Sequence, residues 1–297
     1  MYYVELCWLH DEPSLKEGLQ AFLGSSGQLL KRHLSSKEQK RAIRSGDVSR
    51  LPIDLVNHLG INPAYQGPPV RILRETDDVI VLHKPPGVHC HPLRYSDDNT
   101  LLNFLAREGK WEALRVNQAH YDRGLLYRLD EETSGVLVLA KTEKLYQEVR
   151  GSFSVQVKRK FYWAIVEGDF DKDGAYAHHF LATGVKGGKQ KVSEQAHPGS
   201  EEGALAVGKV LSFGGKSLLL VKLKTGLRHQ IRAQLSFLGH PILGDELYGG
   251  KQAERLFLHA LRYEWRDTDE DFTPELFHLF FDLDGALEVT HDMFRVF

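Results

Sequence analysis

The chain has 297 residues, of which 42% are hydrophobic and 26% charged, and its formal net charge is −2. This composition predicts a globular protein with one large domain or two unequal ones. No apolar run is long enough to cross a bilayer, and the first residues lack a basic segment followed by an apolar one, so we expect a cytoplasmic protein with no membrane partner. Two cysteines, Cys7 and Cys90, exclude a disulfide framework and indicate no metal site.

A small N-terminal domain is predicted over residues 1–68, followed by a larger domain over residues 69–297. Leu15 to Leu23 predicts one short helix in the small domain. Asn62 to Pro69 is dense in turn-forming and extended-chain residues, including three prolines, and is interpreted as the linker between the two domains.

Residues 31–50 are strongly basic, with seven lysines and arginines against two acids, although the whole chain is nearly neutral. Ser35 or Ser36 can cap a basic helix that Gly46 ends. Such a helix is typical of contact with a phosphate backbone, the alternative being a solvated helix face. The candidate RNA contacts of this helix are Lys37, Lys40, Arg41 and Arg44.

The larger domain is predicted to be α+β, with helices around a mixed, mostly antiparallel sheet. Residues 183–203, rich in Gly, Lys, Gln, Ser and Glu, predict an irregular exposed excursion. Apolar runs predict strands at Val79–Leu82, Val136–Ala140, Phe161–Val166, Ser217–Leu223 and Leu276–Leu283. Helical spacing and capping residues predict helices at Leu101–Glu108, Thr142–Phe153 and Arg228–Leu238.

A carboxylate stands before one of these strands. Arg128 and Asp130 lie one residue apart, and a Thr-Ser-Gly turn leads from them into the apolar run Val136–Ala140. This places Asp130 in a loop at the mouth of a buried strand, which suits a reactive acid. On spacing alone, a surface ion pair of little energetic value is the alternative.

Two arginines, Arg228 and Arg232, are four residues apart in the last expected helix of the domain, which Gly239 ends. Residues at this spacing share one helix face, so both can point into a cleft. A pair of solvated arginines is the alternative.

Six groups of residues occur in an order that resembles the RluA-type RNA pseudouridine synthases, over roughly residues 71–265. They are Lys84-Pro85-x-Gly87 with His91-Pro92, Arg128-Leu129-Asp130-x-x-Thr133-Ser134-Gly135, Lys160-x-Tyr162-x-Ala164-x-Val166-x-Gly168, Thr225-Gly226 with His229-Gln230-Ile231-Arg232, Gly239 to Gly249, and Leu258-His259-Ala260. The resemblance implies a pseudouridine synthase fold and the isomerisation of uridine in rRNA or tRNA. It also implies that the enzyme uses no cofactor, nucleotide or metal. We expect a monomer.

The resemblance gives roles to residues that the chemistry requires. Breaking the glycosidic C–N bond and rejoining the base through carbon needs a carboxylate near the sugar, either to attack it or to assist proton loss; by resemblance this is Asp130. Tyr162 matches the aromatic residue that holds the detached uracil, and its hydroxyl can help to remove a proton. Arg232 matches the cation that holds the aspartate in place. Arg128 can fill the space that the flipped nucleotide leaves in the RNA.

The remaining predicted RNA contacts are Thr133 and Arg228, although turn formation also explains Thr133. The chain differs from the usual sequence motifs of the family at three positions. These are Tyr127, where many relatives have histidine, Leu227, and Gln234, which replaces another histidine. Residues 1–68 resemble faintly the small RNA-binding domain, named after a small-subunit ribosomal protein, that many relatives carry.

Two other functions fit the same residues. One is an RNA-binding or RNA-folding protein that keeps the fold without useful catalysis. The other is a glycosidase-like enzyme in which Asp130 works with a second acid about 5–10 Å away, for which the sequence offers no obvious candidate.

Overall fold

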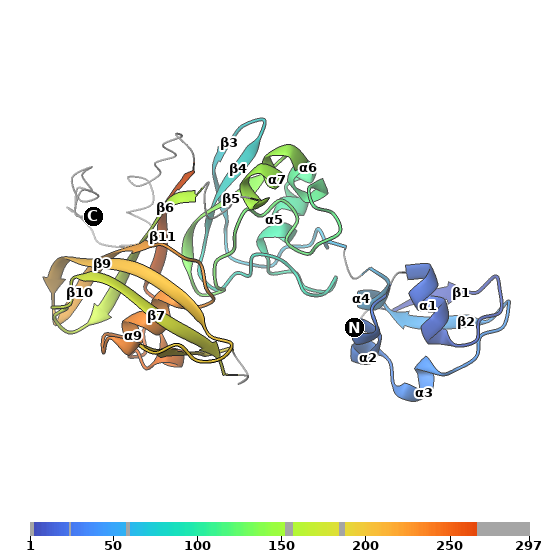
Figure 1. Cartoon of the computed structure of the whole chain (residues 1–297). Coiled ribbons are helices and arrows are strands. Elements are labelled where there is room, and N and C mark those ends of the chain that lie inside the picture. The colour runs from blue at the N-terminus through green and yellow to red at the C-terminus, as the bar shows by residue number, and fades with distance from the viewer. Residues whose placement is uncertain (1–2, 24, 58–59, 152–156, 184–187, 266–297) are drawn as a thin grey trace. The chain divides into compact units, whose positions relative to one another are not determined.

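The computed structural model describes residues 3–23, 25–57, 60–151, 157–183 and 188–265. The chain forms two compact units (Figure 1). The first unit comprises Met1–Gly67, His91–Lys110 and Gln118–Tyr121. The second comprises Pro68–Cys90, Trp111–Asn117 and Asp122–Phe297. Among the described residues, no helix has the length and apolar character needed to span a membrane.

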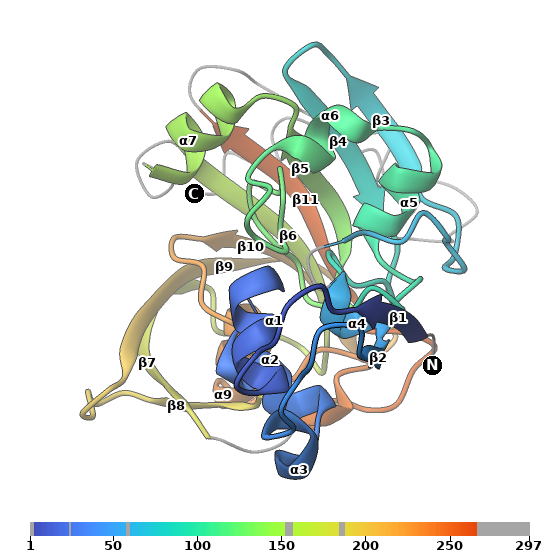
Figure 2. The same ribbon diagram turned by 90° about the vertical axis from the view of Figure 1, so that its right-hand side faces the viewer.

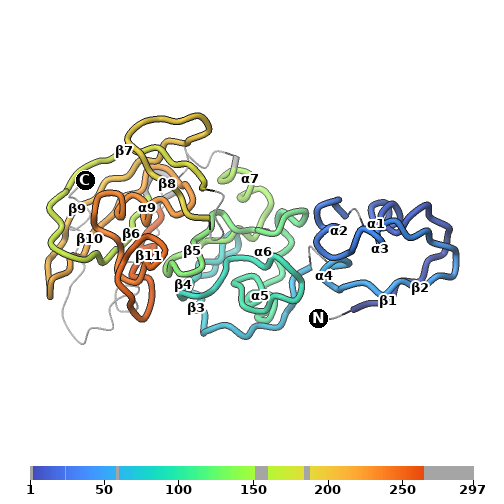
Figure 3. Tube along the Cα trace, turned by 90° about the horizontal axis from the view of Figure 1, so that it is seen from below, coloured from blue at the N-terminus to red at the C-terminus, as the bar shows by residue number. Residues whose placement is uncertain are grey.

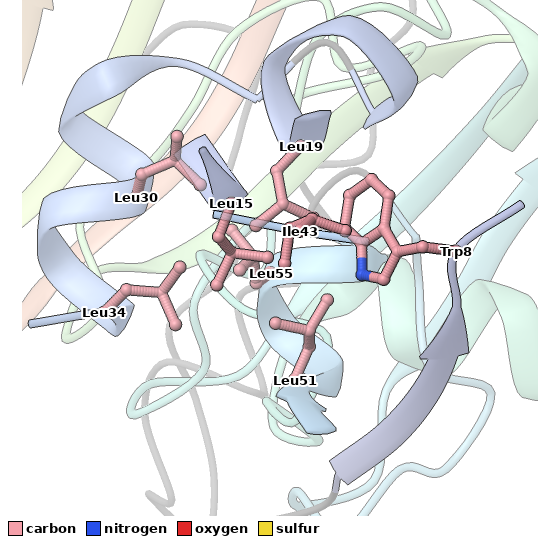
Figure 4. Close-up of a cluster of buried hydrophobic side chains, with 8 residues drawn as sticks. All are labelled: Trp8, Leu15, Leu19, Leu30, Leu34, Ile43, Leu51 and Leu55. Atoms are coloured by element: carbon pink, nitrogen blue, oxygen red, sulfur yellow. The ribbon is translucent and has the colours of Figure 1, made fainter. Parts of the chain in front are cut away.

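The first unit packs short helices around one apolar cluster, which contains Trp8, Ile43 and six leucines (Figure 4). The indole nitrogen donates a hydrogen bond to the Ser49 hydroxyl at 2.8 Å, so its polar atom is satisfied inside the core. The elements are β1 (Tyr3–Cys7), α1 (Leu15–Leu23), α2 (Gly27–His33), α3 (Ser36–Gln39), β2 (Val48–Pro52), α4 (Ile53–Val56) and α5 (Leu101–Arg107), with β1 antiparallel to β2. The predicted helices at Leu15–Leu23 and Leu101–Glu108 are confirmed, the second one residue shorter.

The expected basic helix is much shorter than predicted. Ser35 caps it as foreseen, in a capping box with Glu38, but α3 ends at Gln39 and not at Gly46. The backbone leaves the helix because Ile43 must reach the apolar cluster, where it is buried and pairs with Glu12 through a β-bridge. A helix continuing to Gly46 would forgo that strand-like pairing.

The segment interpreted as a linker is packed within the first unit. The Asn103 side chain donates a hydrogen bond to the carbonyl of Asn62 at 2.7 Å, and the Tyr65 ring lies edge-on to Phe104. Tyr65 is buried, which explains why this proline-rich segment is ordered. The assignment of residues 1–68 as a separate domain stays a prediction.

The second unit is built on a large sheet, and the predicted α+β organisation is confirmed. Within the described residues the sheet has nine strands in the order β3-β4-β5-β11-β6-β10-β9-β7-β8. Figure 1 shows β11, near the red end of the colour range, between β5 and β6. β5 and β11 run parallel, and the other paired strands of the described sheet run antiparallel. The strands are β3 (Arg71–Glu75), β4 (Val79–Lys84), β5 (Ser134–Ala140), β6 (Val157–Glu167), β7 (Gly174–Ala182), β8 (Gln190–Ser193), β9 (Glu201–Phe213), β10 (Lys216–Leu223) and β11 (Leu258–Trp265).

The most apolar strands lie inside the sheet. Every residue of β4 and β5 is buried, as their continuous apolar runs predict. Residues 183–203 were predicted to be irregular, but this is wrong for β8 and for the start of β9. β8 forms because Val192 packs near Phe180 of β7 and the Tyr248 hydroxyl accepts a hydrogen bond from the Gln190 amide.

Helices cover parts of this sheet: α6 (Trp111–Arg115), α7 (Glu143–Gly151), α9 (Gln230–Phe237) and the 3₁₀ turn η1 (Glu246–Tyr248). In two views, α9 lies beside β8, where Ala233 packs with Phe180 (Figures 2 and 3). The predicted helix from Arg228 is corrected, because α9 begins two residues later. His229, with φ of 54°, interrupts the helical backbone, so Arg228 and Arg232 do not share a helix face. The predicted strand at Leu276–Leu283 and the end of the helix at Phe153 lie outside the described residues.

Candidate active site

The Asp130 loop is tied to the sheet on both sides. The Thr133 amide donates to the Asp130 carbonyl at 3.1 Å, which closes the turn before β5. Two residues later, Gly135 has φ of +125°, and a Cβ there would lie 2.1 Å from the carbonyl oxygen of Ala260. Glycine is therefore required where β5 meets β11. The close approach of the two strands fixes the point at which the Asp130 loop ends and β5 begins.

The end of β4 holds the loop from the other side. The ammonium of Lys84 is fully buried and donates to the carbonyls of Glu131, at 2.7 Å, and Pro85, at 3.0 Å. Burial lowers the pKa of Lys84 to about 8, although Cys90, Asp130 and neighbouring carboxylates act against this shift. The Cys90 thiol lies against the Leu129 backbone, with its sulfur 3.2 Å from the carbonyl oxygen and 3.3 Å from the amide nitrogen. Cys90 is thus part of the loop scaffold.

Arg232 is the cation beside Asp130. Its Nη1 lies 3.6 Å from Asp130 Oδ2 and 3.5 Å from Glu132 Oε2. Its Nε and Nη2 donate to the two carboxylate oxygens of Asp245, at 2.7 and 2.8 Å. Burial lowers the pKa of Arg232, but the hydrogen bonds and charge of Asp245, with Asp130 and Glu132, raise it above its usual value. The bidentate pair with Asp245 fixes the guanidinium plane and directs Nη1 toward the loop.

His229 lies beside Asp130 at the N-terminus of α9. Its Nε2 lies 3.9 Å from Asp130 Oδ1, and its Nδ1 is 3.1 Å from the Tyr248 hydroxyl. Burial lowers the pKa of His229, with Asp130 acting in the opposite direction. The contact with Tyr248 holds the imidazole at the start of the helix.

Tyr162 lies on β6, and its hydroxyl forms a hydrogen bond with the Tyr263 hydroxyl of β11. The side chain is buried, which raises the pKa of Tyr162; the Tyr263 hydrogen bond lowers it, and the charge of Asp130 raises it further. The ring of Tyr127 stacks on Tyr263, with centroids 3.8 Å apart and planes 8° from parallel. Three tyrosines from three parts of the second unit therefore form one connected group.

The other residues predicted to contact RNA fall into two groups. In the second unit, Arg128 and Arg228 are exposed, whereas Thr133 is buried, with its amide in the turn before β5. The Arg228 guanidinium lies close to the backbone of Gly188.

The basic residues of the first unit are all exposed: Lys37, Lys40, Arg41 and Arg44. Arg41 donates to the Ser49 hydroxyl at 2.7 Å and lies 3.9 Å from Asp47. Arg44 lies 3.4 Å from Asp11. Both arginines already have partners within their own unit.

No role was predicted for two side chains of the site, Asp245 and Tyr263. Asp245 stands inside the quoted motif Gly239 to Gly249, so its place was marked although its role was not. Tyr263 follows the motif Leu258-His259-Ala260 and carried no signal, because its contact with Tyr162 depends on strand pairing.

Two of the departures have structural explanations. Gln234 is fully buried, and its amide lies 3.0 Å from His178 Nδ1 and 3.1 Å from the carbonyl oxygen of Gly203, so it holds α9 against β7 and β9. The Leu227 side chain is partly buried and packs against the apolar cluster of Phe180, Ala233 and Tyr248.

Comparison with known proteins identifies the family. A profile described as RNA pseudouridylate synthase matches residues 78–237. The chain is 33% identical to "Ribosomal large subunit pseudouridine synthase D" of Borreliella burgdorferi, over 84% of this chain and 76% of that protein. It is 32% identical to the protein of the same name from Nitrosomonas europaea, over 61% of this chain and 50% of the other.

A solved structure shares the fold. "Human RNA Pseudouridylate Synthase Domain Containing 1" has a TM-score of 0.56 and 21% sequence identity, and the match covers 76% of this chain and 93% of that one. The predicted pseudouridine synthase fold is confirmed. With the family profile and the identity to curated relatives, the chain belongs to the RNA pseudouridylate synthase family and is an isomerase that acts on RNA.

Proposed function

We propose that this synthase modifies uridines of large-subunit ribosomal RNA and that Asp130 is its catalytic carboxylate. The names of its relatives support the choice of RNA. The observation that carries the catalytic proposal is the arrangement around Arg232. This buried cation is fixed by two hydrogen bonds to Asp245, and its Nη1, which also contacts Glu132, lies 3.6 Å from the Asp130 carboxylate.

The Asp130 carboxylate is held but reachable. Its side chain is 26% exposed, so a flipped-out nucleotide can bring its sugar against one oxygen while Arg232 contacts the other. From this position the carboxylate either attacks the sugar or assists proton loss while the glycosidic bond breaks. Negative charge beside the electron-poor sugar stabilises the transition state in both cases.

Tyr162 supplies the aromatic wall for the detached uracil. The base must turn so that its carbon, instead of its nitrogen, faces the sugar, and a flat buried ring allows that rotation while excluding water. The Tyr162 hydroxyl, which is hydrogen-bonded to Tyr263, serves as a hydrogen-bonding group toward the base.

RNA contacts are proposed for the exposed basic side chains. Arg128, two residues from Asp130, is placed to enter the gap left by the flipped nucleotide. In the first unit, Lys37 and Lys40 can meet phosphates directly, whereas Arg41 and Arg44 exchange an exposed carboxylate partner for a phosphate. Thr133 and Arg228 remain predicted contacts.

The test is tritium release from cellular RNA labelled at carbon five of uracil, with ribosomal and transfer RNA fractionated beforehand. The unchanged protein is expected to release tritium from large-subunit ribosomal RNA. Asp130→Asn is expected to be slower by about a thousand-fold or more. Glu131→Gln is the matched control, because it removes the neighbouring charge and leaves the Glu131 carbonyl that binds Lys84.

Each part of the proposal can fail separately. Release from transfer RNA alone would overturn the choice of RNA and keep the catalytic assignment. Equal rates for Asp130→Asn and the unchanged protein would overturn the assignment of Asp130. We also propose a cytoplasmic monomer, which light scattering at micromolar concentration and cell fractionation test.

A further inference from the structure

The partner of Tyr162 is brought into place by an irregularity in β11. The pairing of β11 with β6 sets Ala260 opposite Tyr162 and Arg262 opposite Phe161, so Leu261 is an extra residue in the ladder. Such a bulge reverses the alternation of side chains beyond it. Without it, Arg262 would be on the face of Tyr162. With it, Tyr263 is on that face instead.

The contact that results is close and enclosed. The hydroxyls of Tyr162 and Tyr263 are hydrogen-bonded to each other, and the two rings meet edge to face, with centroids 6.2 Å apart. Both side chains are at most 6% exposed. A hydrogen bond in such surroundings holds its partners firmly, because water does not compete for either hydroxyl.

Tyr127 supports the other side of Tyr263. The two rings are stacked, and the Tyr127 hydroxyl donates to the carbonyl of Val136 at 3.2 Å. Tyr263 is thereby held by ring stacking on one side and by its hydroxyl on the other. Tyr127 is one of the positions at which the chain differs from the usual motifs of the family. Its ring provides the flat surface on which the Tyr263 ring stacks.

We propose that Tyr263 is a positioning residue for the isomerisation, which sets the orientation of the Tyr162 ring and hydroxyl through their shared hydrogen bond while Tyr127 holds Tyr263 in place. This inference rests on the proposed function of Tyr162. The hydrogen bond anchors the Tyr162 ring at its far end, so the ring keeps one plane while the uracil turns against it. It also fixes the direction of the Tyr162 O–H bond relative to the base.

The test is a double-mutant cycle in single-turnover tritium release, with the full chain in excess over cellular RNA labelled at carbon five of uracil. Tyr263→Phe removes one hydroxyl and keeps the ring on Tyr127. It is expected to lower the maximal rate about ten-fold, with little change in the protein concentration that gives half the maximal rate. In a Tyr162→Phe background, where the shared hydrogen bond is already absent, Tyr263→Phe is expected to change the rate less than two-fold.

Tyr146→Phe is the matched control, because it removes the hydroxyl of another buried tyrosine of the second unit, which is bonded to Asn117 and has no part in the proposed positioning of Tyr162. It is expected to keep the maximal rate even where its melting temperature falls as far as that of Tyr263→Phe. Circular dichroism at the assay temperature shows whether each variant is folded, and the rates are compared below the lowest melting temperature of the set.

Two results overturn the inference and are distinguishable. If Tyr162→Phe is slow but Tyr263→Phe is not, or if the two effects multiply in the double variant, Tyr263 does not act through Tyr162 and the proposed role of Tyr162 stands. If Tyr162→Phe has the full rate, the role of the Tyr162 hydroxyl in the proposed function fails, and the inference fails with it.

Discussion

Each unit contains an arginine–aspartate pair, and the two pairs have very different surroundings. Arg232 and Asp245 have side chains 5% and 0% exposed and are joined at 2.7 Å. Arg44 and Asp11 are 79% and 62% exposed and lie 3.4 Å apart. The same two residue types thus form a fixed part of a site in one unit and an exchangeable surface contact in the other.

Burial explains the difference. In a dry setting, an arginine that loses its carboxylate is left as an uncompensated charge, so the geometry of the pair is strongly enforced. At the surface, water and salt replace either partner at little energetic loss, and the arginine is available to an incoming phosphate. Buried pairs can therefore orient a neighbouring group such as Asp130, whereas exposed ones serve binding.

The largest expected effect comes from breaking the buried pair. Asp245→Asn removes the charge opposite Arg232 and is expected to lower the free energy of unfolding by about 3–5 kcal/mol, as measured by urea titration. The rate of tritium release should also fall, because Nη1 is no longer directed at Asp130. Glu132→Gln is the control, since Glu132 is 51% exposed and its loss should change stability by about 0.5 kcal/mol or less. A loss below 1 kcal/mol for Asp245→Asn would contradict the comparison.

A second contrast concerns two glycines with positive φ. Gly135 of the second unit has backbone atoms of Ala260 where a Cβ would lie, whereas Gly46 of the first unit, with φ of +91°, has open space. Gly135→Ala is expected to lower the free energy of unfolding by about 3 kcal/mol, through overlap as well as strain. Gly46→Ala should lower it by about 1 kcal/mol, from strain alone. Equal losses in thermal unfolding would show that the β5–β11 contact relaxes.

The buried environment also affects a histidine of the sheet. Burial, together with nearby arginines and Lys84, lowers the pKa of His83 from 6.5 to about 4. As the pH falls, the unfolded chain therefore takes up a proton before the folded chain does, and stability is lost between pH 6.5 and 4. Between pH 6.5 and 4, the free energy of unfolding of the unchanged protein is expected to fall by about 2–3 kcal/mol more than that of His83→Gln. Urea titrations at several pH values measure this difference. Parallel pH curves for the two proteins would argue against a neutral buried His83.

The smallest expected effect belongs to the exposed pair. Arg44→Ala should change the free energy of unfolding by about 0.5 kcal/mol or less. If Arg44 meets a phosphate, the same change lowers RNA affinity a few-fold and reduces the slope of log affinity against log salt by about one. Unchanged affinity and slope at several salt concentrations would remove Arg44 from the RNA contacts.

The interior of the second unit was predictable where its strands contain continuous apolar runs. β4, β5, β6 and β10 all appear as apolar runs in the sequence. β8 did not, since only Val192 among its four residues is apolar and its pairing depends on β7 and Tyr248. The basic helix of the first unit was overestimated for a related reason: the burial of Ile43 outweighed local helix propensity.

In the site, too, the residues that belong to sequence motifs were predicted, and those that depend on distant contacts were not. Asp130, Tyr162 and Arg232 were found because motif order fixed their positions along the chain. The side chains that hold these residues in place were not found, because their roles depend on contacts between distant segments of the chain. Asp245 acts through the orientation of a guanidinium, and Tyr263 reaches Tyr162 only because of the bulge at Leu261. A pattern along one strand cannot reveal an extra residue in its pairing.

The central position of β11 also bears on how the protein is made. Ser134 at the start of β5 and its hydrogen-bond partner His259 in β11 are 125 residues apart in the chain. At a synthesis rate of about 5–20 residues per second, the edge of β5 waits for roughly 6–25 s before β11 leaves the ribosome, and the edge of β6 waits for a shorter time. Open apolar strand edges attract other chains. A nascent chain of this enzyme should therefore depend most on chaperones during that interval, and the loop that carries Asp130 is among the last parts to become ordered.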